Sequence, residues 1–269
     1  MIVYAIEKMR IALLVEYDGT NYFGFQKQKL NQTKTIQYHI DQSIKKIANH
    51  DIKTACGGRT DTGVHACNQV IHFDTSSKRS DFNWLKGINT YLPPDIFVKN
   101  IFHVDNDFHA RFSVISRTYR YVIYNNILYS PLNSRYALHY QNRIDVEKIE
   151  KSFKYFIGEN DFSSFRGSGC SSPSPIKNIK SITIKKNKDK IYIEITANSF
   201  LYHMVRNMVG FFIDIGIGKI PLMNVKKLIH VKDRRKLSKT VSPCGLFLTR
   251  VNYPSKYKIK CDNQYRFII

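Results

Sequence analysis

The chain has 269 residues, of which 42 are Lys or Arg and 21 are Asp or Glu, so its formal net charge is +21. A hydrophobic share of 43% with 17 Tyr and 17 Phe excludes a chain that is disordered as a whole, and the length allows one large domain or two small ones. A charge this positive indicates a polyanionic partner, nucleic acid rather than an anionic membrane, although a codon bias toward Lys could account for part of the excess.

Strand and helix patterns alternate along the first half of the chain. An apolar run over 10–17 is typical of a buried strand, and Ile recurs at helical spacing over 35–49. Residues 52–56 and 68–75 predict two more strands. The segment between them, GGRTDTGVHA at 57–66, is therefore expected to be an interstrand loop.

A second helix and a strand complete this half. Asp81 is expected to cap the helix, which ends before Pro93. Three residues are predicted to share its buried face, namely Trp84, Ile88 and Tyr91. A strand over 96–104 follows.

The second half repeats this order of patterns. Its expected elements are a strand over 118–125, a helix capped by Asp145 and closed by Gly158, a hairpin of 179–186 with 190–197, helices from about Phe200 and near Val225, and a strand over 245–251. The Ser- and Pro-rich segment 168–175 is expected to be a loop.

Cysteine usage and the N-terminal segment indicate the compartment. The cysteines are odd in number, widely spaced and without a metal-ligand rhythm; they are Cys56, Cys67, Cys170, Cys244 and Cys261. Reduced thiols in a cytosolic protein fit this pattern best, and no metal site is expected. Glu16 and Asp18 end the first apolar run far short of a signal peptide or a membrane span. We therefore expect a cytoplasmic protein without membrane insertion.

Interleaved helices and a hairpin predict an α+β fold. We expect two similar α/β halves with largely antiparallel sheets flanked by helices. The N-terminal domain is predicted over 8–107 and carries the 57–66 loop. The C-terminal domain is predicted over 108–257 and completes an active-site cleft between the halves.

Asp61 stands in the loop between Arg59 and His65, with glycines on both sides. Glycines permit a sharp turn and a close approach of a ligand, so the carboxylate has room to project. On spacing alone, a turn Asp that bonds its own backbone and pairs with Arg59 is the simpler interpretation. Other motifs change this interpretation.

Three motifs accompany GGRTDTGVHA, namely FHARF at 108–112, SRTYRY at 116–121 and FLYHMVRNMVG at 200–210. In this order they resemble the TruA family of tRNA pseudouridine synthases. The likeness continues through NYFGFQKQ at 21–28, GENDFSSF at 158–165 and GLFL at 245–248. It implies the pseudouridine synthase fold and a homodimeric isomerase, without cofactor or metal, that converts uridine to pseudouridine at positions 38, 39 and 40 in the anticodon arm of tRNA.

The resemblance also implies roles for individual residues. Carried over by motif, Asp61 is the catalytic aspartate and nucleophile, and Arg59 assists base flipping and contacts RNA. Tyr119 packs on the target base, and Arg206 sits beside Asp61. The segment that lies on the RNA comprises Phe108, His109, Ala110, Arg111 and Phe112. Whether the carboxylate attacks the sugar, attacks the base or removes a ribose proton stays open.

These roles have physical reasons. A stacked uridine must be extruded before it can be isomerised, and the planar guanidinium of Arg59 can occupy the space that it leaves. An Asp with a pKa near 3.9 is ionised at neutral pH, and a cation such as Arg206 opposes the protonation that burial favours. Tyr119 offers a stacking face and a hydroxyl.

Other interpretations stay open at this point. Arg206 could instead pair with Glu194 or Asp214, and the histidines are assigned to packing or phosphate contact. A tRNA-binding chaperone without turnover would gain nothing from Asp61, Arg59 and Tyr119. A hydrolase built on Asp61 lacks a second carboxylate or a metal site.

The chain departs from the family pattern at three positions. Phe25 replaces an expected Trp, and Ser172 and Lys177 stand where Arg is usual, so tRNA contacts from the loop over 168–177 are left undetermined.

Overall fold

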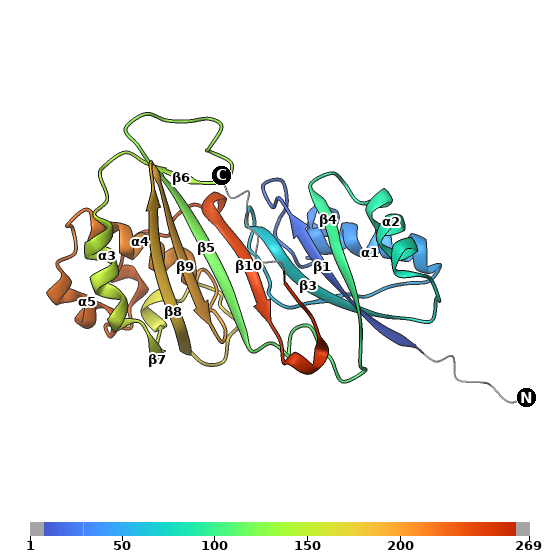
Figure 1. Cartoon of the computed structure of the whole chain (residues 1–269). Coiled ribbons are helices and arrows are strands. Elements are labelled where there is room, and N and C mark those ends of the chain that lie inside the picture. The colour runs from blue at the N-terminus through green and yellow to red at the C-terminus, as the bar shows by residue number, and fades with distance from the viewer. Residues whose placement is uncertain (1–7, 29, 262–269) are drawn as a thin grey trace, which may run out of the picture. The chain divides into compact units, whose positions relative to one another are not determined.

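The computed structural model describes residues 8–28 and 30–261, and the chain divides into two compact units (Figure 1). Within these residues, the first unit comprises 8–115 and 248–261, and the second comprises 116–247. The predicted domains, 8–107 and 108–257, differ from these units at both boundaries. At the second boundary, residues 248–261 group with the first unit although they follow the second in the chain, which a pattern read along the sequence does not reveal.

The first unit contains a sheet and two helices. Its strands are β1 (Met9–Tyr17), β2 (Ala55–Cys56), β3 (His65–Thr75), β4 (Ile96–Val104) and the larger part of β10 (Leu246–Asn252). They follow the order β4-β1-β3-β10, and β2 also pairs with β3. Strand β1 is antiparallel to both β3 and β4. The helices α1 (Ile36–Ala48) and α2 (Asp81–Tyr91) pack against each other, and α2 also packs against β4.

Strand β1 and helix α1 form where the hydrophobic pattern predicts them. Residues 11–15 of β1 are all buried, so both faces of the strand are covered, as the continuous apolar run requires. In α1, Ile36, Ile40 and Ile44 lie four residues apart and are fully buried. Burying each such side chain contributes about 1.5–3 kcal/mol to the free energy of unfolding. This burial stabilises the helix.

Helix α2 ends before Pro93 as predicted, but its N-cap and one residue of its predicted buried face differ from the prediction. Its N-cap is Ser80, whose hydroxyl accepts the Asn83 N–H, and not Asp81. Asp81 is instead the first helical residue, where its carboxylate faces the positive end of the helix dipole. Trp84 is buried as predicted, but Tyr91 is 50% exposed, and the prediction that it shares the buried face was wrong.

The second unit likewise contains a sheet and helices. Its strands are β5 (Ser116–Asn125), β6 (Leu138–Tyr140), β7 (Gly158–Asp161), β8 (Ile176–Asn187) and β9 (Lys190–Ala197). They follow the order β5-β9-β8-β7 with antiparallel pairing, and β6 pairs in parallel with β5. The helices are α3 (Val146–Ser152), α4 (Met204–Gly216) and α5 (Leu222–Ile229), and α3 contacts the other two. The prediction of an α+β fold with largely antiparallel sheets is confirmed.

Local signals in the second unit are confirmed with two adjustments. Helix α3 ends at Ser152, and Gly158, which was predicted to close it, is instead the first residue of β7. Asp145 caps α3 by accepting the N–H groups of Glu147 and Lys148. Strands β8 and β9 form the predicted hairpin. Helix α4 begins at Met204 and not at Phe200, because His203 has a left-handed backbone with φ 60°.

Short 3-10 helices complete the described elements; they are η1 (Gln32–Lys34), η2 (Phe153–Tyr155), η3 (Ser163–Phe165), η4 (Arg234–Lys236), η5 (Pro243–Gly245) and η6 (Ser255–Tyr257).

Candidate active site

The GGRTDTGVHA motif forms the loop between β2 and β3, as predicted, and its last two residues already belong to β3. Thr60 is buried at 6% exposure, whereas Arg59 before it is exposed. Asp61 is half-buried. The loop therefore has an inner residue that anchors it, and it carries a carboxylate and a guanidinium nearer the surface.

Strand β3 holds the first part of this loop through Gln69. The Gly58 N–H donates to Gln69 Oε1 at 3.1 Å, and the Gln69 side-chain amide donates back to the Gly58 carbonyl. The hydroxyls of Tyr17 and Thr60 lie 2.7 Å apart. Because Gln69 and Tyr17 are buried, these bonds are shielded from water and fix the backbone on the N-terminal side of Asp61.

The segment after β1 holds the other side of the loop. The Phe25 N–H donates to the Thr60 carbonyl at 3.0 Å, and the Gly63 N–H donates to the Tyr22 carbonyl at 3.2 Å. Gly24, with φ +82°, lies so close that a Cβ on it would be 2.6 Å from the Thr60 carbonyl oxygen. The backbone is thus clamped before and after Asp61.

Sequence reasoning did not identify these clamping residues. Gln69 lies in a strand that reads as ordinary core, and Tyr17 is the end of an apolar run. The segment NYFGFQKQ at 21–28 contains Gly24, but its sequence by itself indicates only a likeness to the family. His65 is buried, with Nδ1 at 3.1 Å from both the Gly19 nitrogen and Asp18 Oδ1, a position that fits packing.

Replacing Gln69 with Ala is expected to loosen the loop. It leaves the buried N–H and carbonyl of Gly58 without these partners, which costs about 1–3 kcal/mol of unfolding free energy. Urea unfolding measures this loss. Gln28→Ala is the matched control, because Gln28 also donates to a backbone carbonyl, that of Phe23, but is exposed. Equal losses in the two variants would contradict the clamp.

The FHARF segment divides into buried and accessible residues. Phe108 and Ala110 are fully buried, whereas Arg111 is exposed and Phe112 is 74% exposed. The Phe108 ring packs in the interior against other rings. His109 is half-buried, with its ring centroid 4.3 Å from that of Phe112. Of the five residues predicted to contact RNA, only His109, Arg111 and Phe112 are therefore accessible to it. Phe108 and Ala110 support them from the interior.

Acid is expected to lower the free energy of unfolding through His72, a residue of the first unit. Its ring accepts the Ala110 N–H at 3.1 Å. Burial, together with the nearby His109 and Arg10, lowers the pKa of His72 from 6.5 to about 4. Below pH 6.5 the unfolded chain binds a proton that the folded chain excludes, so the free energy of unfolding falls as the pH drops toward 4. His72→Gln keeps an acceptor without titrating. Urea unfolding across this range should show a shallower decline for the variant, and equal slopes would contradict the assignment.

Tyr119 and Arg206 belong to the second unit. Tyr119 lies on β5 and is 7% exposed, with its ring edge-on to Phe200 at 5.1 Å between centroids. Arg206 lies on α4, is half-buried, and donates from Nε to the Val241 carbonyl at 2.8 Å. The approach of these two residues to Asp61 remains a prediction.

The carboxylates considered as alternative partners of Arg206 have other cations beside them. Glu194 accepts from two nitrogens of Arg120, at 3.0 and 3.2 Å. Asp214 pairs with Lys219 at 3.1 Å.

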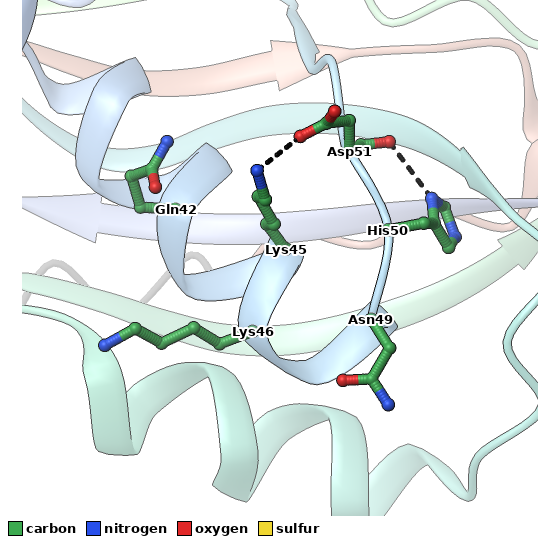
Figure 2. Close-up of a pocket in the computed structure, with 6 residues that line it drawn as sticks. All are labelled: Gln42, Lys45, Lys46, Asn49, His50 and Asp51. Atoms are coloured by element: carbon green, nitrogen blue, oxygen red, sulfur yellow. Dashed lines mark hydrogen bonds and ion pairs between the residues drawn. The ribbon is translucent and has the colours of Figure 1, made fainter.

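Figure 2 shows a pocket at the C-terminal end of α1. Lys45 and Lys46 line it, but Lys45 pairs with Asp51 at 2.6 Å, and His50 lies within hydrogen-bond distance of the Asp51 carbonyl and of Thr75. An acid beside one of the two lysines disfavours an anion there. The pocket contains none of the predicted site residues.

Two further findings concern metal sites and membrane-spanning helices. Among residues 8–28 and 30–261, no group of three or more His, Cys, Asp or Glu side chains is arranged to hold a metal ion. In the same residues, no helix combines the length and the apolar character needed to cross a membrane.

Comparison with known proteins places the loop in a family context. A family described as tRNA pseudouridine synthase matches residues 13–113 and 153–254, which include Asp61 and Arg206, while Tyr119 lies between the matched ranges. The tRNA pseudouridine synthase A of Psychromonas ingrahamii is 45% identical over 251 residues, covering 93% of this chain and 95% of the relative. Proteins of the same name from Vibrio parahaemolyticus and Shewanella amazonensis are 41% and 42% identical, covering 94% and 93% of this chain and 95% of each relative.

Proposed function

The chain belongs to the tRNA pseudouridine synthase family, and we propose that it isomerises uridine at positions 38, 39 and 40 in the anticodon arm of tRNA. The reaction breaks the bond between N1 and C1′, joins C1′ to C5, and moves a proton from C5 to N1. Atoms balance within the substrate, so no co-reactant is consumed. The protein must extrude the base, cleave one bond, and hold the free uracil while it turns.

Asp61 is the proposed catalytic carboxylate. The observation that carries this assignment is the clamp on both sides of it, formed by Gln69 and by the segment with Gly24. A reacting group must be held within a fraction of an ångström of its productive position, and buried backbone bonds meet that demand. A simple turn Asp would not need two distant segments to fix its neighbours.

Three other residues complete the proposed site. Arg59 is exposed two residues before Asp61, so its guanidinium can replace the extruded uridine in the stack and bind phosphate. Tyr119 packs on the flipped base, and Arg206 keeps the Asp61 carboxylate ionised. Cations next to the reacting group also attract the RNA backbone, in keeping with the net charge of +21.

We further propose that the protein acts in the cytoplasm as a homodimer that binds tRNA through His109, Arg111 and Phe112. The accessibility of the last two supports this contact. A chaperone that binds tRNA without turnover remains the principal competing function, and turnover itself distinguishes it.

The test is site-resolved turnover. Unmodified tRNA transcripts would retain a single uridine at position 38, 39 or 40, with cytidine at the other two, and pseudouridine would be mapped chemically after incubation. Conversion is expected in all three transcripts and not in one that has cytidine at each position. Conversion elsewhere in the tRNA would contradict the assignment to the anticodon arm. Binding without any conversion would favour the chaperone.

A further inference from the structure

Tyr202 and His203 form a stacked pair just before α4, in which Tyr202 is exposed and His203 is half-buried. Their ring centroids are 3.8 Å apart and their planes differ by 25°. Tyr202 is 44% exposed, although it follows the buried Leu201 and precedes a helix that is almost entirely buried. Several aromatic pairs in the core of this unit meet edge-on, as Phe165 and Phe211 do at 89°. A flat pair at the surface is therefore a distinct feature.

The backbone beneath the pair is held from two sides. The Gly167 N–H donates to the Tyr202 carbonyl at 2.8 Å, and the Tyr202 N–H donates to Cys170 Sγ at 3.3 Å. His203 has φ 60°, a left-handed conformation that is uncommon without glycine and that persists only where surrounding structure enforces it. The rings are thus presented in one orientation and lose little freedom when something stacks on them.

Cations hold the neighbouring loop. Arg166 donates from Nη2 to the carbonyls of Cys170 and Ser172, both at 2.8 Å. The Lys177 ammonium donates to the Ser174 carbonyl at 2.9 Å. Lys177 is buried and Arg166 is half-buried, so both act from inside and hold the loop in place. Residues 168–175 carry no large apolar side chain, and such a loop suits a nucleic acid better than an apolar protein face.

We propose that Tyr202 and His203 are a stacking platform for an unpaired nucleobase of the bound tRNA, distinct from the uridine that reacts. Unpaired RNA bases stack on Tyr and His rings, and a pre-oriented surface ring gives affinity without reading sequence. The inference rests on the proposed function, since it requires RNA to bind this unit. It also gives a role to the loop over 168–177, which its own Lys177 and the preceding Arg166 hold in place beside the platform.

Affinity and its salt dependence test the platform. Tyr202→Ala is expected to weaken binding of an anticodon-arm RNA about 10-fold, while Tyr202→Phe keeps the ring and binds as the wild type does. The slope of log affinity against log salt should not change, because a stacked ring displaces no phosphate counterion. Tyr129→Ala is the matched control, since Tyr129 is also exposed in this unit and also lies beside a His ring, but in another loop.

A fluorescence experiment observes the stacking directly. The chain has one Trp, Trp84, which is fully buried in the first unit, so its emission is expected to be insensitive to RNA. Tyr202→Trp adds an exposed indole at the platform, and titration with the anticodon-arm RNA should quench it. Tyr129→Trp should not be quenched.

The outcomes separate this inference from the proposed function. If the wild type forms pseudouridine but Tyr202→Ala binds as tightly as the wild type, the platform is wrong and the enzyme assignment stands. A loss of affinity that Tyr202→Phe shares with Tyr202→Ala would make the Tyr202 hydroxyl, and not its ring, the contact with RNA, which also overturns the inference. The wild type could bind RNA without making pseudouridine, while RNA still quenches the emission of Tyr202→Trp. In that case the platform stands and the proposed function fails.

Discussion

Replacing Asp61 with Asn is expected to abolish pseudouridine formation while tRNA still binds. The carboxamide has nearly the same shape but cannot act as a nucleophile or as a base. Such a change at a reacting centre costs roughly 10⁴-fold in turnover. Affinity is dominated by phosphate contacts with Lys and Arg, which this substitution does not touch. Single-turnover conversion of unmodified tRNA and filter binding at the same salt concentration measure the two properties.

The control for this prediction is Asp51→Asn. Asp51 is an exposed carboxylate, paired with Lys45, in the segment that leads to β2. The variant should convert tRNA at the wild-type rate, because it makes the same chemical change outside the loop. Turnover that survives in Asp61→Asn would overturn the catalytic assignment. A loss of binding together with turnover would make Asp61 a structural residue of the loop.

Strands and helices with a strong hydrophobic periodicity could be predicted from the sequence. The residues that cap the helix ends were harder to predict. The apolar run of β1 and the Ile stripe of α1 each dictate burial by themselves, so no distant partner is needed to predict them. The α2 cap is different, because Ser80 and Asp81 are both good N-cap residues and stand side by side. Their roles depend on where the preceding chain enters, and the pattern along the helix does not contain that information.

The residues of the catalytic loop could be predicted from its sequence motif, but the contacts that hold the loop could not. Glycines around Asp61 indicated a loop with access for a ligand, and the resemblance supplied the role of the carboxylate. The clamp joins the loop to Gln69 on β3 and to Gly24, which lies 37 residues before Asp61 in the chain. Contacts between segments so far apart leave no periodic trace, so only the fold reveals them. The same holds for Phe108 and Ala110, which both contact Tyr253, more than 140 residues further along the chain.

Replacing Gly24 with Ala is expected to damage catalysis without removing any functional group. The added Cβ would lie 2.6 Å from the Thr60 carbonyl oxygen and 3.1 Å from the Asp61 carbonyl carbon, and both are backbone atoms that cannot rotate away. The backbone at Gly24 has φ +82°, which an L side chain also disfavours. We expect the unfolding free energy to fall by about 2–4 kcal/mol from strain and overpacking.

The larger effect is expected on turnover. A loop pushed aside by about 1 Å moves the Asp61 carboxylate away from its position for attack, and misplacement on this scale costs roughly 100-fold. Single-turnover conversion, measured at a temperature where the variant is folded by circular dichroism, gives this factor. Binding of tRNA should change much less, because Arg111 and the other exposed cations are unaffected.

Gly218→Ala separates the clash from the backbone strain. Gly218 has φ +80°, nearly the same as Gly24, but a Cβ there meets nothing within 4 Å. Its substitution should cost about 1–2 kcal/mol of stability from the left-handed backbone alone and leave turnover unchanged. If the two variants lose the same stability and both keep wild-type turnover, the contact between Gly24 and the loop does not position Asp61. A selective loss of turnover in Gly24→Ala makes the NYFGFQKQ segment a positioning element of the catalytic loop.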